Sequence, residues 1–352
     1  MKNSKLTTKK ILIIAAAVIV VLIIAAFAFL KMGTGAVSSS NTDEVTVEIV
    51  SGSGSYDIIN SLDEAGLIKS KTAAKIYVRL FAPDTLQANT YVLNKSMSLS
   101  EMLDIISTGE FKYVLKSQFT IKPGETYLDA SANISEALGI DQQEIIDKWS
   151  DETYLKELIS KYWFLTDEIL QSEILCPLEG YLYPDTYFVT DKEPDIESVT
   201  SQVLDLMDQK LTPYKDEIEK SGKTTYQCIT FASVVQSESK YSEDKPKIAG
   251  VFVNRIEQGM PLQSDITVLY ALGEKKVDVS SGETTVDSKY NTYKYTGLPI
   301  GPVSNPDITT IKASLEYESN DYLYFFAKED GTVVYSKTYD EHLAAVEKYG
   351  WY

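Results

Sequence analysis

The feature that most constrains this chain is an uninterrupted apolar run near its N-terminus. Residues 11–30 read ILIIAAAVIVVLIIAAFAFL, without a charge or a proline. As a helix, such a run is about 30 Å long, which matches the hydrocarbon core of a bilayer. Lysines at positions 2, 5, 9 and 10 precede the run, and only Lys31 follows it closely. The positive-inside rule therefore predicts one transmembrane helix, with residues 1–10 in the cytoplasm and the remainder extracellular.

A cleaved signal peptide is the alternative, because small residues occur at Ala25, Ala26 and Ala28. The apolar core of a signal peptide is usually 7 to 15 residues long, so the length of this run favours an uncleaved anchor in the cell membrane. Residues 31–44 are rich in glycine and serine and lack apolar periodicity. We expect this segment to be a flexible linker.

Charge and composition exclude several classes of protein. The 352 residues carry a net charge of −18, which argues against nucleic acid as a partner. Two cysteines, Cys176 and Cys228, and one histidine, His342, cannot form a zinc cluster, and no metal or cofactor is expected. The sequence leaves undecided whether the two cysteines form a disulfide. A histidine-dependent nucleophile would have to recruit His342, so carboxylates are the expected acid and base groups.

The exported part is predicted to be α+β. Val47-x-Ile49-x-x-Gly52 and Phe119-x-Ile121-x-x-Gly124 each precede a helical pattern, which indicates strand, glycine turn and helix. A repeated small module is the favoured interpretation, although three matching positions can also arise by chance. We expect a small α/β module at 45–145 and a second, mixed α+β domain at 146–352.

One carboxylate stands out by its position in a predicted helix. Phe231, Val234, Val235 and Glu238 occupy positions i, i+3, i+4 and i+7, so Glu238 shares the apolar face. Burial disfavours a charged carboxylate, raises its pKa and suits it to donate a proton. The alternative is a glutamate at the helix end that Lys240 satisfies.

A second carboxylate and a group of tyrosines follow Glu238. Asp265 precedes an apolar helical pattern, so helix capping is its simplest role. The tyrosines combine an aromatic face with a hydroxyl, which suits sugar rings, although packing in the core explains them equally. They are Tyr241, Tyr270, Tyr290, Tyr293 and Tyr295.

Five strings along the chain resemble the endolytic murein transglycosylases of the YceG-like family. They occur in the family's order and lie within residues 178–342, a stretch of about half of the chain. The resemblance implies a catalytic domain at 146–352 and a LysM-like membrane-proximal module at 45–145. The strings are LEGYLYPDTY (178–187), ASVVQSES (232–239), IAGVFVNRIEQGMPLQSDITVLYALG (248–273), YNTYKYTGLPIGPVSNP (290–306) and YLYFFAKEDGTVVYSKTYDEH (322–342).

The resemblance also assigns roles to residues. The family's catalytic acid lies in an E-x-E motif, whose first position is Gln236 here and whose second is Glu238. The chain also carries Asp307 where glycine is common. The substrate-binding positions that the resemblance implies are Gln236, Gln263, Asp265, Tyr290, Asn291, Thr292 and Tyr293.

The implied reaction cleaves the bond between N-acetylmuramic acid and N-acetylglucosamine in nascent peptidoglycan glycan strands. One acid can suffice, because the muramic acid's own 6-hydroxyl attacks C1 and leaves a 1,6-anhydro end. Murein synthases are the protein partners that the resemblance suggests. Two alternatives stay open: a catalytically weak glycan-binding or scaffold protein of cell-wall synthesis, and a hydrolytic muramidase in which Asp265 activates water.

Overall fold

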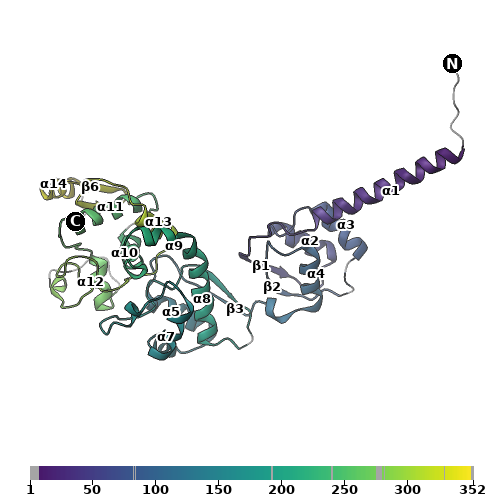
Figure 1. Ribbon diagram of the computed structural model, residues 1–352. Coiled ribbons are helices and arrows are strands. Elements are labelled where there is room, and N and C mark those ends of the chain that lie inside the picture. Colours follow the sequence, from purple (N-terminus) through teal and green to yellow (C-terminus); the bar gives the residue numbers. More distant parts are fainter. Residues whose placement is uncertain are drawn as a thin grey trace, which may run out of the picture. The chain divides into compact units, whose positions relative to one another are not determined.

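A computed structural model describes residues 8–81, 83, 85–191, 193–238, 241–274, 280, 282–328 and 330–349. It divides the chain into two compact units (Figure 1). Unit 1 comprises residues 1–118 and 188–193, and unit 2 comprises residues 119–187 and 194–352. Helices dominate the described ranges, which also contain three two-stranded sheets. The predicted mixed α+β class is confirmed.

Unit 1 begins with the predicted apolar helix, α1 (Thr8–Gly33), which projects from the rest of the unit. It is long and apolar enough to cross a membrane. Its large apolar side chains from Leu12 to Phe29 are exposed rather than packed in a core. Such a helix has no internal partner for its apolar surface, as a membrane-spanning segment requires.

The remainder of unit 1 packs helices against a two-stranded sheet. Strands β1 and β2 are antiparallel, with Val47 opposite Tyr91, and both side chains are buried in the core. A capping box at Ser98 and Glu101 opens the last α-helix of the unit, as the sequence predicts. The elements are β1 (Glu44–Ile49), α2 (Ser55–Glu64), α3 (Lys71–Phe81), β2 (Asn89–Asn94), α4 (Leu99–Thr108) and the 3₁₀ turn η1 (Phe111–Tyr113).

The start of the expected flexible linker, 31–44, is held against this unit. Helix α1 continues through Gly33, where an added Cβ would lie only 2.4 Å from the Cβ of Ala73. The Leu99 N–H donates to the Thr34 carbonyl at 2.9 Å, and the Ser38 N–H donates to the Lys95 carbonyl at 3.0 Å. Residues 33–38 are therefore packed and hydrogen-bonded, in contrast to a free tether.

The chain passes between the two units in a pair of neighbouring strands, β3 (Ser117–Thr120) and β4 (Thr186–Val189). The expected boundary at 145 therefore differs from the observed division after residue 118. Helix α5 (Tyr127–Leu138) belongs to unit 2, where it packs against α6 (Gln142–Trp149). Both predicted strand–glycine–helix segments form, but the second contributes to unit 2 and is not a separate module.

Unit 2 is built around α10 (Thr225–Glu238), whose residues from Cys228 to Gln236 are all buried. A helix buried on every side lies at the centre of its domain. Around it pack α11 (Lys245–Glu257), α12 (Asp265–Leu272) and α13 (Ile308–Leu315). The other elements are α7 (Glu152–Lys161), η2 (Asp167–Leu170), α8 (Ile196–Leu211), η3 (Thr212–Tyr214), α9 (Lys215–Lys220), η4 (Glu283–Thr285), the antiparallel strands β5 (Tyr324–Ala327) and β6 (Val333–Ser336), and α14 (Tyr339–Tyr349).

The two cysteines do not form a disulfide. Cys176 and Cys228 are both buried free thiols. Burial raises the pKa of both thiols, so each stays in its neutral form and behaves as a small apolar side chain.

Candidate active site

Glu238 is the last residue of α10, where the central helix reaches the edge of the core. Phe231, Val234 and Val235 are buried on the same face, as the spacing predicts, and Glu238 is partly buried. The hydroxyl of Ser264 donates to Glu238 Oε1 at 2.5 Å. The alternative partner, Lys240, lies outside the described residues. One carboxyl oxygen of Glu238 is thus fixed by a neutral donor.

Ser264 is itself rigidly held. It is the N-cap residue of α12, and its N–H donates to the Thr292 hydroxyl at 3.1 Å. The Thr267 hydroxyl donates to the Ser264 carbonyl at 2.7 Å and lies 2.9 Å from the Thr292 hydroxyl. Sequence reasoning missed Ser264, and the available signal was its place in front of the predicted helix. The N-cap position expected for Asp265 is occupied by Ser264, and Asp265 is the first residue of α12.

The residue before Ser264 has an unusual backbone. Gln263 has φ of 53°, the one non-glycine residue with positive φ in the described part of the chain, and its side chain is exposed. A left-handed backbone is strained for such a residue and persists where neighbours enforce it. Arg255 supplies this restraint, because its Nη1 donates to the Leu262 carbonyl at 2.7 Å and its Nε to the Leu323 carbonyl at 2.6 Å.

The surroundings of Glu238 favour its protonated form. Burial raises the pKa of the Glu238 carboxyl to about 7, and the negative charge of Asp265 acts in the same direction. The Ser264 hydrogen bond and the positive charge of Arg255 oppose this rise. Since desolvation is the largest cause, Glu238 can hold a proton near neutral pH and still release it.

Asp265 and Tyr293 form a second polar pair beside this carboxyl. Asp265 is the first residue of α12, where a negative charge suits the helix N-terminus, and the Tyr293 hydroxyl donates to its Oδ1 at 2.5 Å. Burial and the Asp265 charge raise the pKa of the Tyr293 phenol, which stays a hydroxyl. Both side chains are partly exposed. Gln263, Asp265 and Tyr293 are therefore accessible predicted binding residues.

Three other predicted binding residues are enclosed. Tyr290, Asn291 and Thr292 are each exposed by 1% or less. Asn291 donates to the carbonyls of residues 284 and 286 and accepts from the N–H of residue 293, so its amide is used within the loop. Tyr290 packs its ring against Tyr270 in the core. In this structure these three residues are buried and stabilise the loop, and their side chains are not accessible to a ligand.

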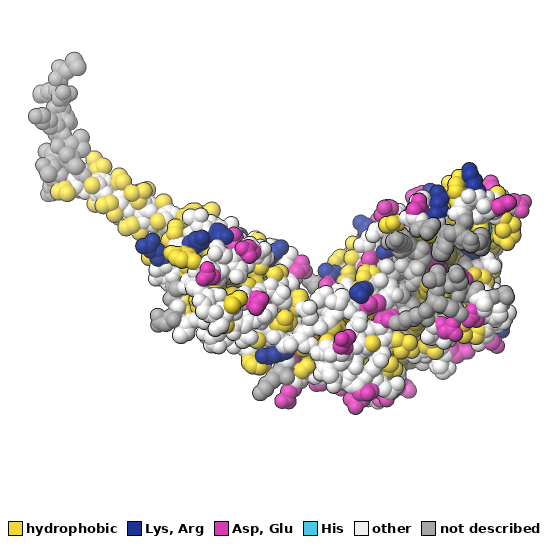
Figure 2. Space-filling model, turned by 180° about the vertical axis from the view of Figure 1, so that it is seen from behind, with side chains coloured by type: hydrophobic (Ala, Val, Ile, Leu, Met, Phe, Trp, Pro, Cys, Tyr) yellow, Lys and Arg dark blue, Asp and Glu magenta, His cyan; other side chains and the backbone are white. Residues whose placement is uncertain are grey.

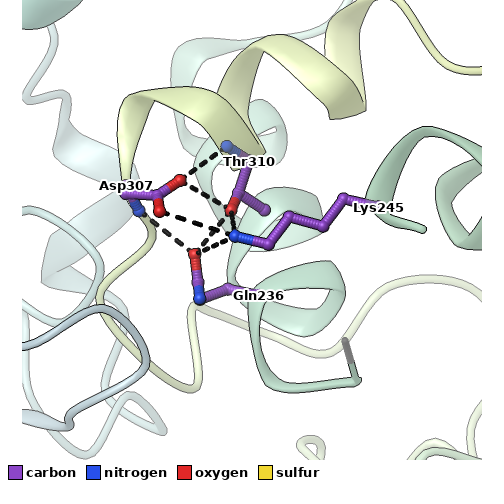
Figure 3. A network of polar contacts seen from close by, with 4 residues as sticks. All are labelled: Gln236, Lys245, Asp307 and Thr310. Carbon is purple, nitrogen blue, oxygen red and sulfur yellow. Dashed lines mark hydrogen bonds and ion pairs between the residues drawn. The ribbon is translucent and has the colours of Figure 1, made fainter. Parts of the chain in front are cut away.

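Gln236, the remaining predicted binding residue, joins a buried polar network (Figure 3). Its Oε1 accepts from Lys245 Nζ at 3.2 Å and from the Thr310 hydroxyl at 2.5 Å. Lys245 is 3% exposed and also lies 3.5 Å from Asp307 Oδ2. Asp307 caps α13 by accepting from the Thr310 N–H at 2.7 Å. The network links α10, α11 and α13 two residues before Glu238.

A second buried carboxyl, Glu179, was not anticipated as a site residue. Its oxygens accept from the Tyr127 N–H at 2.9 Å and from Asn305 Nδ2 at 3.0 Å, and burial raises the pKa of this carboxyl to about 8. Asn305 also donates to the Glu125 carbonyl, and its own carbonyl accepts from the Gly124 N–H. These bonds fix the loop at residues 122–126.

That loop borders an open pocket of about 520 Å³. Across the pocket lie Gln236 and Ser237, the two residues before Glu238, and the side chains of Ile266 and Tyr270. The lining mixes charged and polar side chains with apolar ones, and it includes the two residues that precede a carboxyl of perturbed pKa, which is a combination typical of a ligand site. Of the two carboxyls with a raised pKa, Glu179 is fully buried, whereas Glu238 lies at the edge of the core, where it can serve in general acid and base chemistry.

The chain belongs to the YceG-like family, which it matches over residues 47–348. A relative in Bacillus subtilis (strain 168), named endolytic murein transglycosylase, is 35% identical over 325 residues, or 92% of this chain and 90% of the relative. A relative of the same name in Streptococcus pneumoniae (serotype 2, strain D39) is 33% identical over 322 residues. That match covers 87% of this chain and 58% of the longer relative.

A solved structure agrees with this assignment. The crystal structure of a YceG-like protein from Listeria monocytogenes matches with a TM-score of 0.64 and 33% sequence identity. The match covers 86% of this chain and 99% of that chain.

Proposed function

We propose that the chain is a membrane-anchored endolytic lytic transglycosylase of peptidoglycan, with Glu238 as its catalytic acid and base. The observation that carries this proposal is the state of Glu238: a partly buried carboxyl whose pKa is raised to about 7 and whose Oε1 already accepts from Ser264. Family membership and the names of the relatives give the substrate class.

The proposed reaction uses this carboxyl twice. Because Oε1 accepts from Ser264, we place the proton of the acid form on Oε2, which in this proposal is the oxygen that meets the substrate. Glu238 gives that proton to the oxygen leaving C1 of N-acetylmuramic acid as the glycosidic bond breaks. The 6-hydroxyl of the same sugar then bonds to C1, and its proton goes to Glu238. The acid is regenerated and no water is consumed.

Intramolecular attack explains why one carboxyl suffices. The nucleophile is already tethered to the reacting sugar, so no second base has to position water. Asp265 lies close enough for its charge to raise the pKa of Glu238. In this proposal it also stabilises positive charge at C1, while Gln263 and Tyr293 contact the glycan. Acid and base catalysis by Glu238 contributes about 10²- to 10⁴-fold.

A hydrolytic muramidase is the second candidate. A muramidase would need a second carboxylate that activates water. Asp265 is the candidate, because its negative charge raises the pKa of Glu238 and it therefore lies near that carboxyl. The Tyr293 hydroxyl, however, occupies an Asp265 oxygen. A glycan-binding scaffold without turnover is the third alternative, and it predicts binding of murein without fragments.

The products distinguish these functions. Digestion of purified murein by the intact chain should release fragments ending in 1,6-anhydro-N-acetylmuramic acid, which are lighter than hydrolytic ends by one water and resist borohydride. Mass spectrometry before and after borohydride treatment measures both properties. Reducible ends would instead establish hydrolysis, and a digest without fragments would contradict an enzyme.

We also propose that the β1–α2–α3–β2 module is LysM-like, as the resemblance to the family implies.

We propose further that α1 is an uncleaved single-pass anchor with a cytoplasmic N-terminus and an extracellular catalytic unit. The apolar, exposed surface of α1 and the lysines that precede it support this anchor. Protease added to intact cells should remove unit 2. Recovery of the chain mainly as a released, soluble form would contradict the anchor. Murein synthases are the proposed protein partners, which cross-linking in cells would detect.

A further inference from the structure

We propose that the outer face of α3 lies on the membrane surface and binds the anionic headgroups of phospholipids. This inference rests on the proposed anchor, because α1 must span the bilayer for α3 to reach it. It adds a second contact with the membrane, made by the folded module.

The position of α3 next to α1 is the first step. Gly33, at the end of α1, touches Ala73 in α3 so closely that an added Cβ would lie 2.4 Å from the Ala73 Cβ. The apolar run ends at Leu30, three residues or about 5 Å of helix before Gly33. The first turn of α3 therefore lies at the level of the lipid headgroups when α1 spans the bilayer.

The apolar side chains of α3 are the second step. Its inner face buries Ala73, Ala74 and Val78. Its outer face nevertheless carries Ile76 and Leu80, which are 40% and 60% exposed. Ile76 and Leu80 are four residues apart and adjacent on the helix surface. A short helix with apolar residues on both faces is typical of an element that has one face in the protein and the other at a membrane interface.

Positive charge on the same outer face is the third step. Lys75 and Arg79 alternate with the exposed apolar residues, and neither forms an ion pair with any residue that the structure describes. Lys71, by contrast, pairs with Asp63 at 3.0 Å. Unpaired cations that flank apolar side chains complement a surface that is anionic outside and apolar beneath.

A shallow pocket on this face has the right chemistry for a headgroup phosphate. It has a volume of about 320 Å³ and is lined by Tyr56, Thr72, Lys75, Ile76 and Arg79. The Lys75 ammonium lies 5.9 Å from the centre of the Tyr56 ring. Figure 2 shows Lys and Arg side chains beside apolar ones at the base of α1, on a chain whose net charge is −18. The lining of this pocket thus contains two cations and no acid, so its charge is opposite in sign to the net charge of the chain.

The test places a spin label on the outer face of the full chain. Leu80→Cys carries the label, because the native cysteines are buried. Phe111→Cys is the matched control: Phe111 is also apolar and is 49% exposed, but it lies in η1. Both variants are reconstituted in nanodiscs of phosphatidylcholine, with or without phosphatidylglycerol. Accessibility of the label to oxygen and to a water-soluble nickel complex is measured, and murein cleavage checks the fold.

We expect the label at residue 80 to gain oxygen access and lose nickel access, while the label at residue 111 stays accessible to nickel. Phosphatidylglycerol should strengthen this protection. Adding Lys75→Glu and Arg79→Glu should abolish the extra protection given by phosphatidylglycerol. Losing two positive charges alone shifts the equilibrium between the contacting and free states by about thirtyfold, and reversing them should shift it further.

Equal nickel access at both labels would overturn the contact. Protection that is insensitive to phosphatidylglycerol and to the two charge reversals would overturn headgroup binding. A chain that fails to enter nanodiscs at all would overturn the anchor and this inference together, which distinguishes that failure from an anchored chain whose α3 stays in water.

Discussion

Asp307→Asn should destabilise unit 2 through the loss of one buried charge. Lys245 Nζ has three oxygen neighbours: Thr310 Oγ1 at 2.5 Å, Gln236 Oε1 at 3.2 Å and Asp307 Oδ2 at 3.5 Å. Among these three, Asp307 alone is charged. Removing one partner of a buried ion pair costs about 3 to 5 kcal/mol. The Asp307 side chain is 25% exposed and the contact is long, so we expect about 2 kcal/mol.

Gln236→Glu should reverse this loss. The Gln236 carboxamide oxygen already lies where a glutamate oxygen would face the ammonium. In the Asp307→Asn background, Gln236→Glu therefore returns a counter-charge to Lys245. Alone, it places two carboxylates around one ammonium and should change stability by less than about 1 kcal/mol. Two of the positions where the sequence departs from the pattern that the resemblance implies, Gln236 and Asp307, both contact Lys245. The carboxylate near this lysine therefore comes from the N-cap of α13, and α10 contributes an amide.

Thermal unfolding of the four chains in this double-mutant cycle measures the coupling. For a unit of this size, 2 kcal/mol lowers Tm by about 4 to 8 °C. Asp151→Asn is the matched control, because Asp151 also caps a helix, accepting from the Tyr154 N–H at 2.7 Å, and forms no direct ion pair among the described residues; Lys148 feels its charge only at longer range. Asparagine caps as well as aspartate does. A double variant as unstable as Asp307→Asn alone would refute the counter-ion role.

Three further predictions concern the carboxyls. Glu238→Gln should lower murein cleavage by about 10²-fold or more without changing Tm, because an amide cannot exchange the proton; a parental rate would exclude Glu238 as the acid. The rate of murein cleavage should fall as the pH rises through about 7, because Glu238 then loses its proton. Ser264→Ala should move this fall to higher pH, because the lost hydrogen bond favoured the charged form of Glu238. A pH–rate profile of Ser264→Ala that falls at lower pH would contradict this assignment. Glu179→Gln should lower Tm, because its NH₂ would face a donor, Tyr127 N–H or Asn305 Nδ2; an unchanged Tm in the same scan would exclude that conflict.

Local patterns predicted the helices well. The spacing of Phe231, Val234 and Val235 predicted a helix with these side chains buried and Glu238 in line with them, because a helix repeats every 3.6 residues whatever surrounds it. The spacing did not predict that α10 is buried on every side. The box at Ser98 and Glu101 marked a helix start for the same reason. Such signals involve residues within one or two turns of each other.

Contacts between distant segments were beyond these patterns. Ser264 meets Glu238 across 26 positions, and Asn305 meets Glu179 across 126. The division into units also depends on such a contact: α5 follows β3 closely in sequence, and its Tyr127 N–H donates to Glu179, which belongs to unit 2 as α5 does. The residue pattern within one segment does not indicate which distant segment it contacts. These hydrogen bonds therefore become visible only in the folded chain.

The loop at 290–293 shows why residue type alone cannot separate contact from support. Polar side chains next to glycines and prolines favour a binding rim, yet a buried loop also needs such groups to satisfy its own backbone. The Asn291 side chain forms hydrogen bonds with three backbone groups of the loop, and the Thr292 hydroxyl accepts from the Ser264 N–H. The Tyr293 hydroxyl instead donates to Asp265 at the accessible edge of the site. Consecutive residues of one motif therefore divide between building the loop and presenting a hydroxyl. Only the burial of each side chain, which the fold determines, decides which role it takes.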